Sequence, residues 1–119
     1  MNEPVLVSIV MPSFNQAGFI EQSIDSVLKQ SYQNIELIIA DGGSTDNTLD
    51  ILRDKQSNDS RIRWSSAADS GPAYAINKAL KQARGTIIGW LNSDDLYTEG
   101  AIQRAVDILA CNEQWLMVY

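Results

Sequence analysis

Residues 86–95 read TIIGWLNSDD, an apolar run from Thr86 to Leu91 that leads through Asn92 and Ser93 to the carboxylate pair Asp94 and Asp95. A short run of this kind is typical of a strand buried on both faces of a parallel sheet. Two carboxylates at the end of a buried strand are desolvated and repel each other, so they predict a positive partner. Mg²⁺ or Mn²⁺ suits such hard oxygen ligands. An acidic turn that caps the next helix is an equal alternative.

Strand-like and helix-like segments alternate along the chain. Apolar runs predict strands over residues 5–11, 35–40, 61–64, 86–91 and 115–119. Apolar side chains at helical spacing predict helices over residues 17–30, 45–52, 72–83 and 98–109. Ser44 or Thr45 is expected to cap the second helix, and Gly85 to end the third. This order predicts an α/β fold with a doubly wound, mainly parallel sheet.

Polar clusters follow four of the predicted strands directly. They are residues 12–15, 41–46, 69–71 and 92–95. Ligands of doubly wound sheets bind beyond the carboxyl ends of the strands, so these clusters predict a single site on one rim. The rim is rich in aspartate and would repel a bare phosphate, whereas a bound cation could hold a diphosphate there. The chemistry expected is transfer away from a nucleotide diphosphate, with Phe14 packing against a base or sugar and Asp41 accepting an imide N–H.

Composition limits the other classes of function. The chain has 119 residues, of which 45% are hydrophobic, which is enough for one globular domain with its own core. A net charge of −6 disfavours nucleic acid as a partner. The single cysteine, Cys111, excludes an internal disulfide, and the lack of histidine excludes a Cys/His zinc site. No signal or membrane-spanning pattern is present, so we expect a cytoplasmic protein, peripheral to the inner face of the membrane in a longer parent.

The four clusters together resemble the N-terminal nucleotide-binding half of glycosyltransferase family 2, whose members have the Rossmann-like GT-A fold. The resemblance runs from Val7 to Tyr119 through the segments VSIVMPSFN, DGGSTD, DSG and GWLNSDD. It implies a nucleotide-diphosphate sugar as donor, most often a UDP-sugar, inversion at the anomeric carbon, Mn²⁺ or Mg²⁺ as cofactor, and a saccharide or lipid-linked acceptor. Residues 1–119 would then be the nucleotide-sugar-binding part of a GT-A domain whose acceptor-binding half lies beyond this chain.

The resemblance also implies roles for individual residues. Asp94 would bind the metal, and Asp95 would lie on the donor-sugar side of the catalytic centre. The implied nucleotide-binding residues are Pro12, Ser13, Phe14, Asn15, Asp41, Asp69, Gly71, Asn77, Lys78, Asn92, Ser93 and Asp94.

Two positions depart from the family pattern. Asn92 replaces the first aspartate of the Asp-X-Asp motif, which removes one charge from the metal site, and Ile76 stands where many members have arginine. No residue here can be assigned as the general base, which the family takes from its acceptor half. A non-catalytic nucleotide-sugar-binding or assembly module is therefore the alternative. A fragment without its acceptor half would leave apolar surface uncovered, so we expect self-association.

Overall fold

The computed structural model describes residues 5–67, 77, 79–110 and 117–118. Their centre is a five-stranded sheet with the strand order β3-β2-β1-β4-β5, in which every pairing is parallel. The strands are β1 (Val7–Ser13), β2 (Ile35–Asp41), β3 (Ile62–Ser66), β4 (Ile87–Trp90) and β5 (Met117–Val118). The parallel sheet predicted from the alternating segments is confirmed.

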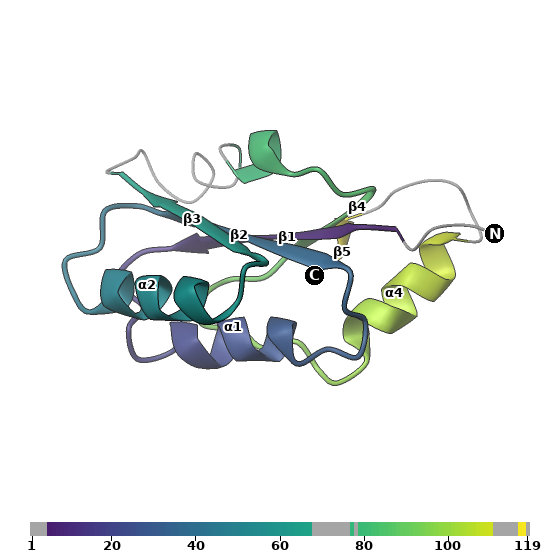
Figure 1. The fold of residues 1–119 in the computed structure, drawn as a ribbon, viewed down its shortest axis with the longest axis horizontal. Helices are drawn as coiled ribbons and strands as arrows, with labels where there is room; N and C mark the ends of the chain where they lie inside the picture. Colours follow the sequence, from purple (N-terminus) through teal and green to yellow (C-terminus); the bar gives the residue numbers. More distant parts are fainter. Residues whose placement is uncertain (1–4, 68–76, 78, 111–116, 119) are drawn as a thin grey trace.

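Helices cover both faces of this sheet (Figure 1). One face carries α1 (Ile20–Leu28), α2 (Thr48–Asn58) and α4 (Ala101–Ala110). Residues 79–82 are helical and lie on the other face, where Ala79 packs with Val10 and Ile38. Most of the helix predicted over residues 72–83, and the position of Cys111, lie outside the described residues. The fold is therefore doubly wound, as the sequence predicts.

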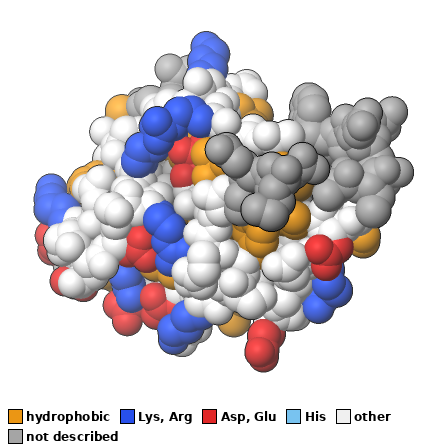
Figure 2. All heavy atoms as spheres, turned by 45° about the vertical axis from the view of Figure 1, so that its right-hand side comes forward, with side chains coloured by type: hydrophobic (Ala, Val, Ile, Leu, Met, Phe, Trp, Pro, Cys, Tyr) orange, Lys and Arg blue, Asp and Glu red, His pale blue; other side chains and the backbone are white. Residues whose placement is uncertain are grey.

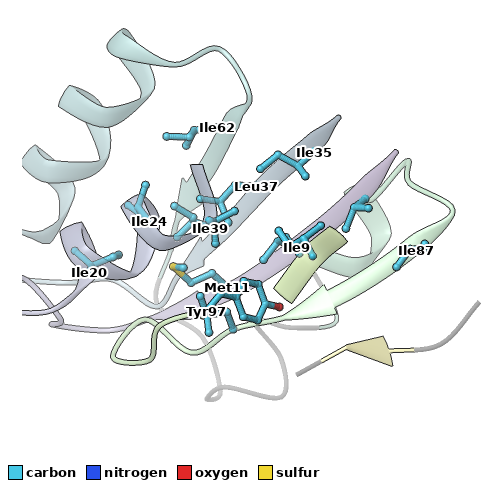
Figure 3. Close-up of a cluster of buried hydrophobic side chains, with 14 of the residues drawn as sticks. Ile9, Met11, Ile20, Ile24, Ile35, Leu37, Ile39, Ile62, Ile87 and Tyr97 are labelled. Carbon is cyan, nitrogen blue, oxygen red and sulfur yellow. The ribbon is translucent and has the colours of Figure 1, made fainter. Parts of the chain in front are cut away.

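The two faces divide the side chains of β1 and β2 by their alternation. Ile9, Met11, Leu37 and Ile39 point to the face of α1 and join its buried side chains, such as Ile24, in the main core (Figure 3). Val10, Ile38 and Ala40 point to the opposite face and form a smaller cluster. Because both faces are buried, these strands read as continuous apolar runs rather than as alternating patterns.

Two element boundaries differ from the predictions for local reasons. β1 continues to Ser13 through Pro12, where the sequence reading expects the strand to break. Proline is tolerated there because the pairing of β1 with β4 ends at Val10, so no neighbour needs a hydrogen bond from residue 12. α4 begins at Ala101 rather than Thr98, because Gly100 has a positive φ of 77° that cannot belong to a helix.

Gly85 is required by a close backbone contact and not as a helix stop. A Cβ at this position would lie 2.5 Å from Ser8 Oγ and 2.6 Å from the Leu6 carbonyl oxygen. The segment before β4 must therefore pass directly against β1. We expect Gly85→Ala to lower the free energy of unfolding by about 1–3 kcal/mol, as overpacking does elsewhere. Gly18→Ala is the control, because a Cβ at Gly18 meets nothing within 4 Å. Equal urea midpoints for both variants would contradict this interpretation.

The described surface mixes both signs of charge. On the face shown in Figure 2, basic side chains lie next to acidic ones. In the part of the chain that the structure describes, no helix combines the length and the apolar composition that crossing a bilayer requires.

Candidate nucleotide-sugar site at the carboxyl edge of the sheet

Hydrogen bonds join the loops that follow β1 and β2. The Asn15 amide N donates to Ser44 Oγ at 2.8 Å, and the Thr45 amide N donates to Asn15 Oδ1 at 2.8 Å. Asn15 takes a left-handed backbone conformation with φ 51°, which asparagine tolerates better than most residues. The Gly42 amide N also donates to the Ser13 carbonyl at 2.8 Å. The first two predicted clusters are thus brought together at one edge.

Asp46 and Thr48 complete this junction next to the start of α2. Thr48 Oγ1 accepts a hydrogen bond from the Gln16 amide at 3.1 Å, and Asp46 Oδ2 accepts one from the Ala17 amide at 3.2 Å. Asp46 Oδ1 accepts from both the amide and the hydroxyl of Thr48. These bonds, above all the one from the Thr48 hydroxyl, hold the pKa of Asp46 below its ordinary value. Asp46 therefore organises the loops after β1 and β2.

Asp41 lies at the end of β2 and is only 2% exposed. Its Oδ2 accepts hydrogen bonds from the Gly43 and Ser44 amides and from Ser66 Oγ, at 3.0, 2.7 and 2.8 Å. Its Oδ1 accepts from Ser44 Oγ at 2.5 Å. Asp41 is predicted to accept a hydrogen bond from the N–H of a nucleotide base. With these internal bonds in place, it would do so through the remaining lone pair of Oδ1. Ser66 lies outside the predicted clusters, and Ser44 was expected to cap a helix, because only the fold reveals that both hydroxyls donate to Asp41.

The acidic loop follows β4, which lies beside β1 in the sheet. Asn92 organises this loop: its Oδ1 accepts from Trp90 Nε1 at 3.0 Å, its Nδ2 donates to Asp95 Oδ2 at 3.3 Å, and its carbonyl accepts from the Asp95 amide at 3.0 Å. Ser93 is buried, whereas Asp94 and Asp95 are exposed. The carboxylate pair therefore faces solvent at the edge where the strands end.

The acidic loop offers the type of ligand that a hard divalent cation prefers. Among the described residues, no three His, Cys, Asp or Glu side chains gather closely enough to hold a metal by themselves. Mg²⁺ and similar ions commonly take only one or two protein carboxylates and complete their shell with water and substrate phosphates. The exposed pair Asp94 and Asp95 fits a site with one or two protein carboxylates, in which water and phosphate supply the other ligands.

The other predicted site residues are placed as follows. Pro12 and Ser13 are buried in β1, and Ser13 Oγ has no hydrogen-bond partner among the described residues. Phe14 is 55% exposed, and Asn77 is exposed. Beside the acidic loop lies an open hollow of about 460 Å³, lined in part by Trp90 and Asp95. Asp69, Gly71 and Lys78 lie outside the described residues.

Solved structures similar to this chain include complexes with nucleotide sugars. S. aureus TarS in complex with UDP-GlcNAc is 28% identical and has a TM-score of 0.83, over 90% of this chain and 32% of that chain. A mannosyltransferase from Pyrobaculum calidifontis in complex with GDP-Man and Mn²⁺ is 28% identical with a TM-score of 0.81, over 87% of this chain and 32% of that chain.

Curated relatives agree with the solved structures. A glycosyltransferase of Haemophilus influenzae is 39% identical over 94% of this chain and 45% of that protein. A hyaluronan synthase of Pasteurella multocida is 39% identical over 87% of this chain and 11% of that protein. The chain thus spans less than half the length of these relatives. The family model described as "Glycosyl transferase family 2" matches residues 8–114, and this chain belongs to that family.

Proposed function

We propose that residues 1–119 form the nucleotide-sugar-binding part of a metal-dependent, inverting glycosyltransferase. Its donor would be a nucleotide-diphosphate sugar, most simply a UDP-sugar, and its acceptor a saccharide or cell-envelope polymer. The observation that carries this proposal is the junction of the loops after β1 and β2, on the same sheet edge as the acidic loop after β4. The donor complexes of the structural neighbours and the polysaccharide synthases among the relatives support it.

The proposed roles follow from the order of the strands at this edge. β2 ends at Asp41, β1 leads to Phe14, and β4 leads to Asp94, and β1 lies between the other two strands. A nucleoside held near Asp41 and Phe14 would direct its diphosphate across the end of β1 toward Asp94. Asp94 would bind the cation, and Asp95 would face the donor sugar. A divalent cation there would neutralise the charge that develops on the leaving diphosphate.

The acceptor, the general base and the cellular location of the enzyme are also proposed. We assign the acceptor and the general base to protein beyond this chain, because an inverting transfer needs a base to deprotonate the attacking hydroxyl. We further propose that the enzyme works in the cytoplasm at the inner face of the membrane. We also propose that the chain self-associates, because a donor-binding half without its acceptor-binding half would leave apolar surface uncovered.

Calorimetric titration with UDP tests the binding proposal directly. We expect a dissociation constant between tens of micromolar and millimolar, roughly −4 to −6 kcal/mol, because only the donor half contributes contacts. Mn²⁺ should strengthen the binding, since Asp94 would hold the cation and the cation would attract the charge of the diphosphate. The matched control is uridine, which lacks phosphates and should gain nothing from Mn²⁺. A chain that binds UDP and uridine equally with or without Mn²⁺ would contradict the metal-bridged site.

A further inference from the structure

We infer that a polar ladder on α1, formed by Ser23 and Ser26 within the helix and by Gln30 just after it, positions the acidic loop for metal binding. This inference rests on the proposed function. Ser23 and Gln30 are 0% and 2% exposed, and Ser26 is half-buried. Buried polar groups are costly unless they form hydrogen bonds, so their partners indicate what they hold in place.

Each member of the ladder contacts the backbone of the segment that contains the acidic loop and leads into α4. Ser23 Oγ donates to the Ser93 carbonyl at 2.9 Å, and Ser26 Oγ accepts from the Tyr97 amide at 3.1 Å. Gln30 Nε2 donates to the Thr98 carbonyl at 2.9 Å. All these partners are 68 or more residues away in sequence, so the bonds join separate elements.

Gln30 also binds the start of α4. Its Oε1 accepts from the Ile102 amide at 3.1 Å, and its Nε2 donates to the Ser26 carbonyl at 2.9 Å. The Ile102 amide belongs to the first turn of α4, where backbone N–H groups lack partners within the helix. The side-chain amide of Gln30 therefore satisfies both a donor and an acceptor of the chain that leaves the acidic loop. An apolar side chain of the same size could do neither.

The Ser23 contact reaches closest to the proposed metal ligand. The Ser93 carbonyl belongs to the same planar peptide group as the Asp94 amide, so holding this carbonyl holds that peptide plane and the Cα atom from which the Asp94 side chain extends. The loop is held on its other side by Tyr97, whose hydroxyl donates to the Trp90 carbonyl at 3.2 Å. The loop is thus anchored at Trp90, Ser93 and Tyr97, while Asp94 and Asp95 between these anchors remain exposed.

The ladder is a set of positioning residues, because it contacts the supporting backbone and not the donor. Outer partners of metal ligands typically contribute about 10–100-fold to metal affinity by orienting the ligand. A loop freed from the ladder would still contain Asp94, but the carboxylate would have to be ordered by the metal itself. We therefore expect the effect in the metal-dependent part of UDP binding and not in the contacts of Asp41 and Phe14.

The test compares Gln30→Met and Ser23→Ala with Ser8→Ala in the full chain. Ser8 is a matched control because it is also a buried serine with two side-chain hydrogen bonds, but these go to Glu36 and Gly85. UDP is titrated with and without Mn²⁺. The increase in UDP affinity that Mn²⁺ produces should be about tenfold smaller in Gln30→Met, and reduced to a lesser extent in Ser23→Ala. The UDP affinity without metal should be unchanged in both variants. Ser8→Ala should retain the full gain.

Amide hydrogen exchange gives a readout without metal. The Asp95 amide donates to the Asn92 carbonyl and not to a ladder residue, so its exchange reports the order of the loop. We expect its exchange to accelerate in Gln30→Met and Ser23→Ala, relative to amides of β1 and β2, but not in Ser8→Ala. Unchanged Asp95 exchange in both ladder variants, or an equal change in Ser8→Ala, would overturn the inference. If Mn²⁺ does not raise the UDP affinity of the unmodified chain, the proposed function is contradicted instead. Hydrogen exchange alone then tests whether the ladder orders the acidic loop.

Discussion

Glu36→Ala lowers the free energy of unfolding by about 3–5 kcal/mol, the loss typical of breaking a buried ion pair from one side. Glu36 is 5% exposed in β2. Its Oε2 accepts from Ser8 Oγ at 2.5 Å and from the Arg84 amide at 2.7 Å, and its Oε1 accepts from Arg63 Nη2 at 2.7 Å. One carboxylate thus joins β1, β2, β3 and the segment before β4. Its removal leaves Ser8 Oγ and the Arg84 amide without this acceptor, whereas Arg63 Nη2 still donates to the Gln82 carbonyl at 2.9 Å.

Urea unfolding at neutral pH measures this loss. We expect a loss near the lower end of this range, at about 3 kcal/mol. The Arg63 side chain is 36% exposed, so water can solvate its charge once Glu36 is removed. Asp50→Ala is the control: Asp50 pairs with Arg53 at 3.1 Å, but the two side chains are 75% and 63% exposed. Exposed pairs contribute roughly 0–1 kcal/mol. A loss for Glu36→Ala as small as that of Asp50→Ala would show that the Glu36 cluster contributes little to stability.

The same cluster makes stability depend on pH. Burial acts to raise the pKa of Glu36, but the hydrogen bonds from Ser8 and Arg84 and the charge of Arg63 outweigh it and hold the pKa below 4.5. A lowered pKa in the folded state means that the stabilisation is complete above pH 4.5 and is lost as pH falls through the folded value. The urea midpoints of the unmodified chain and Glu36→Gln should therefore converge below pH 4.5.

Much of the fold could be predicted because both sheet faces are buried. The runs around Ile9, Leu37 and Ile88 gave the strands, and the order of strands and helices gave the parallel sheet. The errors fall where tertiary contacts override local preference. Ser44, an expected helix cap, binds the Asp41 carboxylate instead, and α2 begins at Thr48. The sequence suggests that Gly85 ends a helix. In the structure, glycine is needed there because a side chain would collide with Leu6 and Ser8.

The candidate site could be predicted less completely than the fold. That the loops after β1, β2 and β4 share one edge follows from the parallel topology alone. The four hydrogen bonds that Asp41 accepts within the protein do not follow from the topology, because Ser66, one of the donors, lies 25 residues away in sequence. The sequence gives a weak indication of the ladder, since Ser23, Ser26 and Gln30 recur at helical spacing. Their hydrogen-bond partners are visible only in three dimensions.

Asp94→Ala lowers turnover by about 100- to 1,000-fold in an enzyme that contains this chain, as the loss of a preorganised stabiliser of transition-state charge does elsewhere. The physical reason is that Asp94 is exposed at the end of β4 and is the proposed protein ligand of the cation. UDP release from a panel of UDP-sugars, with acceptor and limiting Mn²⁺, measures the effect. Asp50→Ala removes an exposed carboxylate from α2 and should leave turnover unchanged. Equal turnover for both variants would exclude Asp94 as a metal ligand.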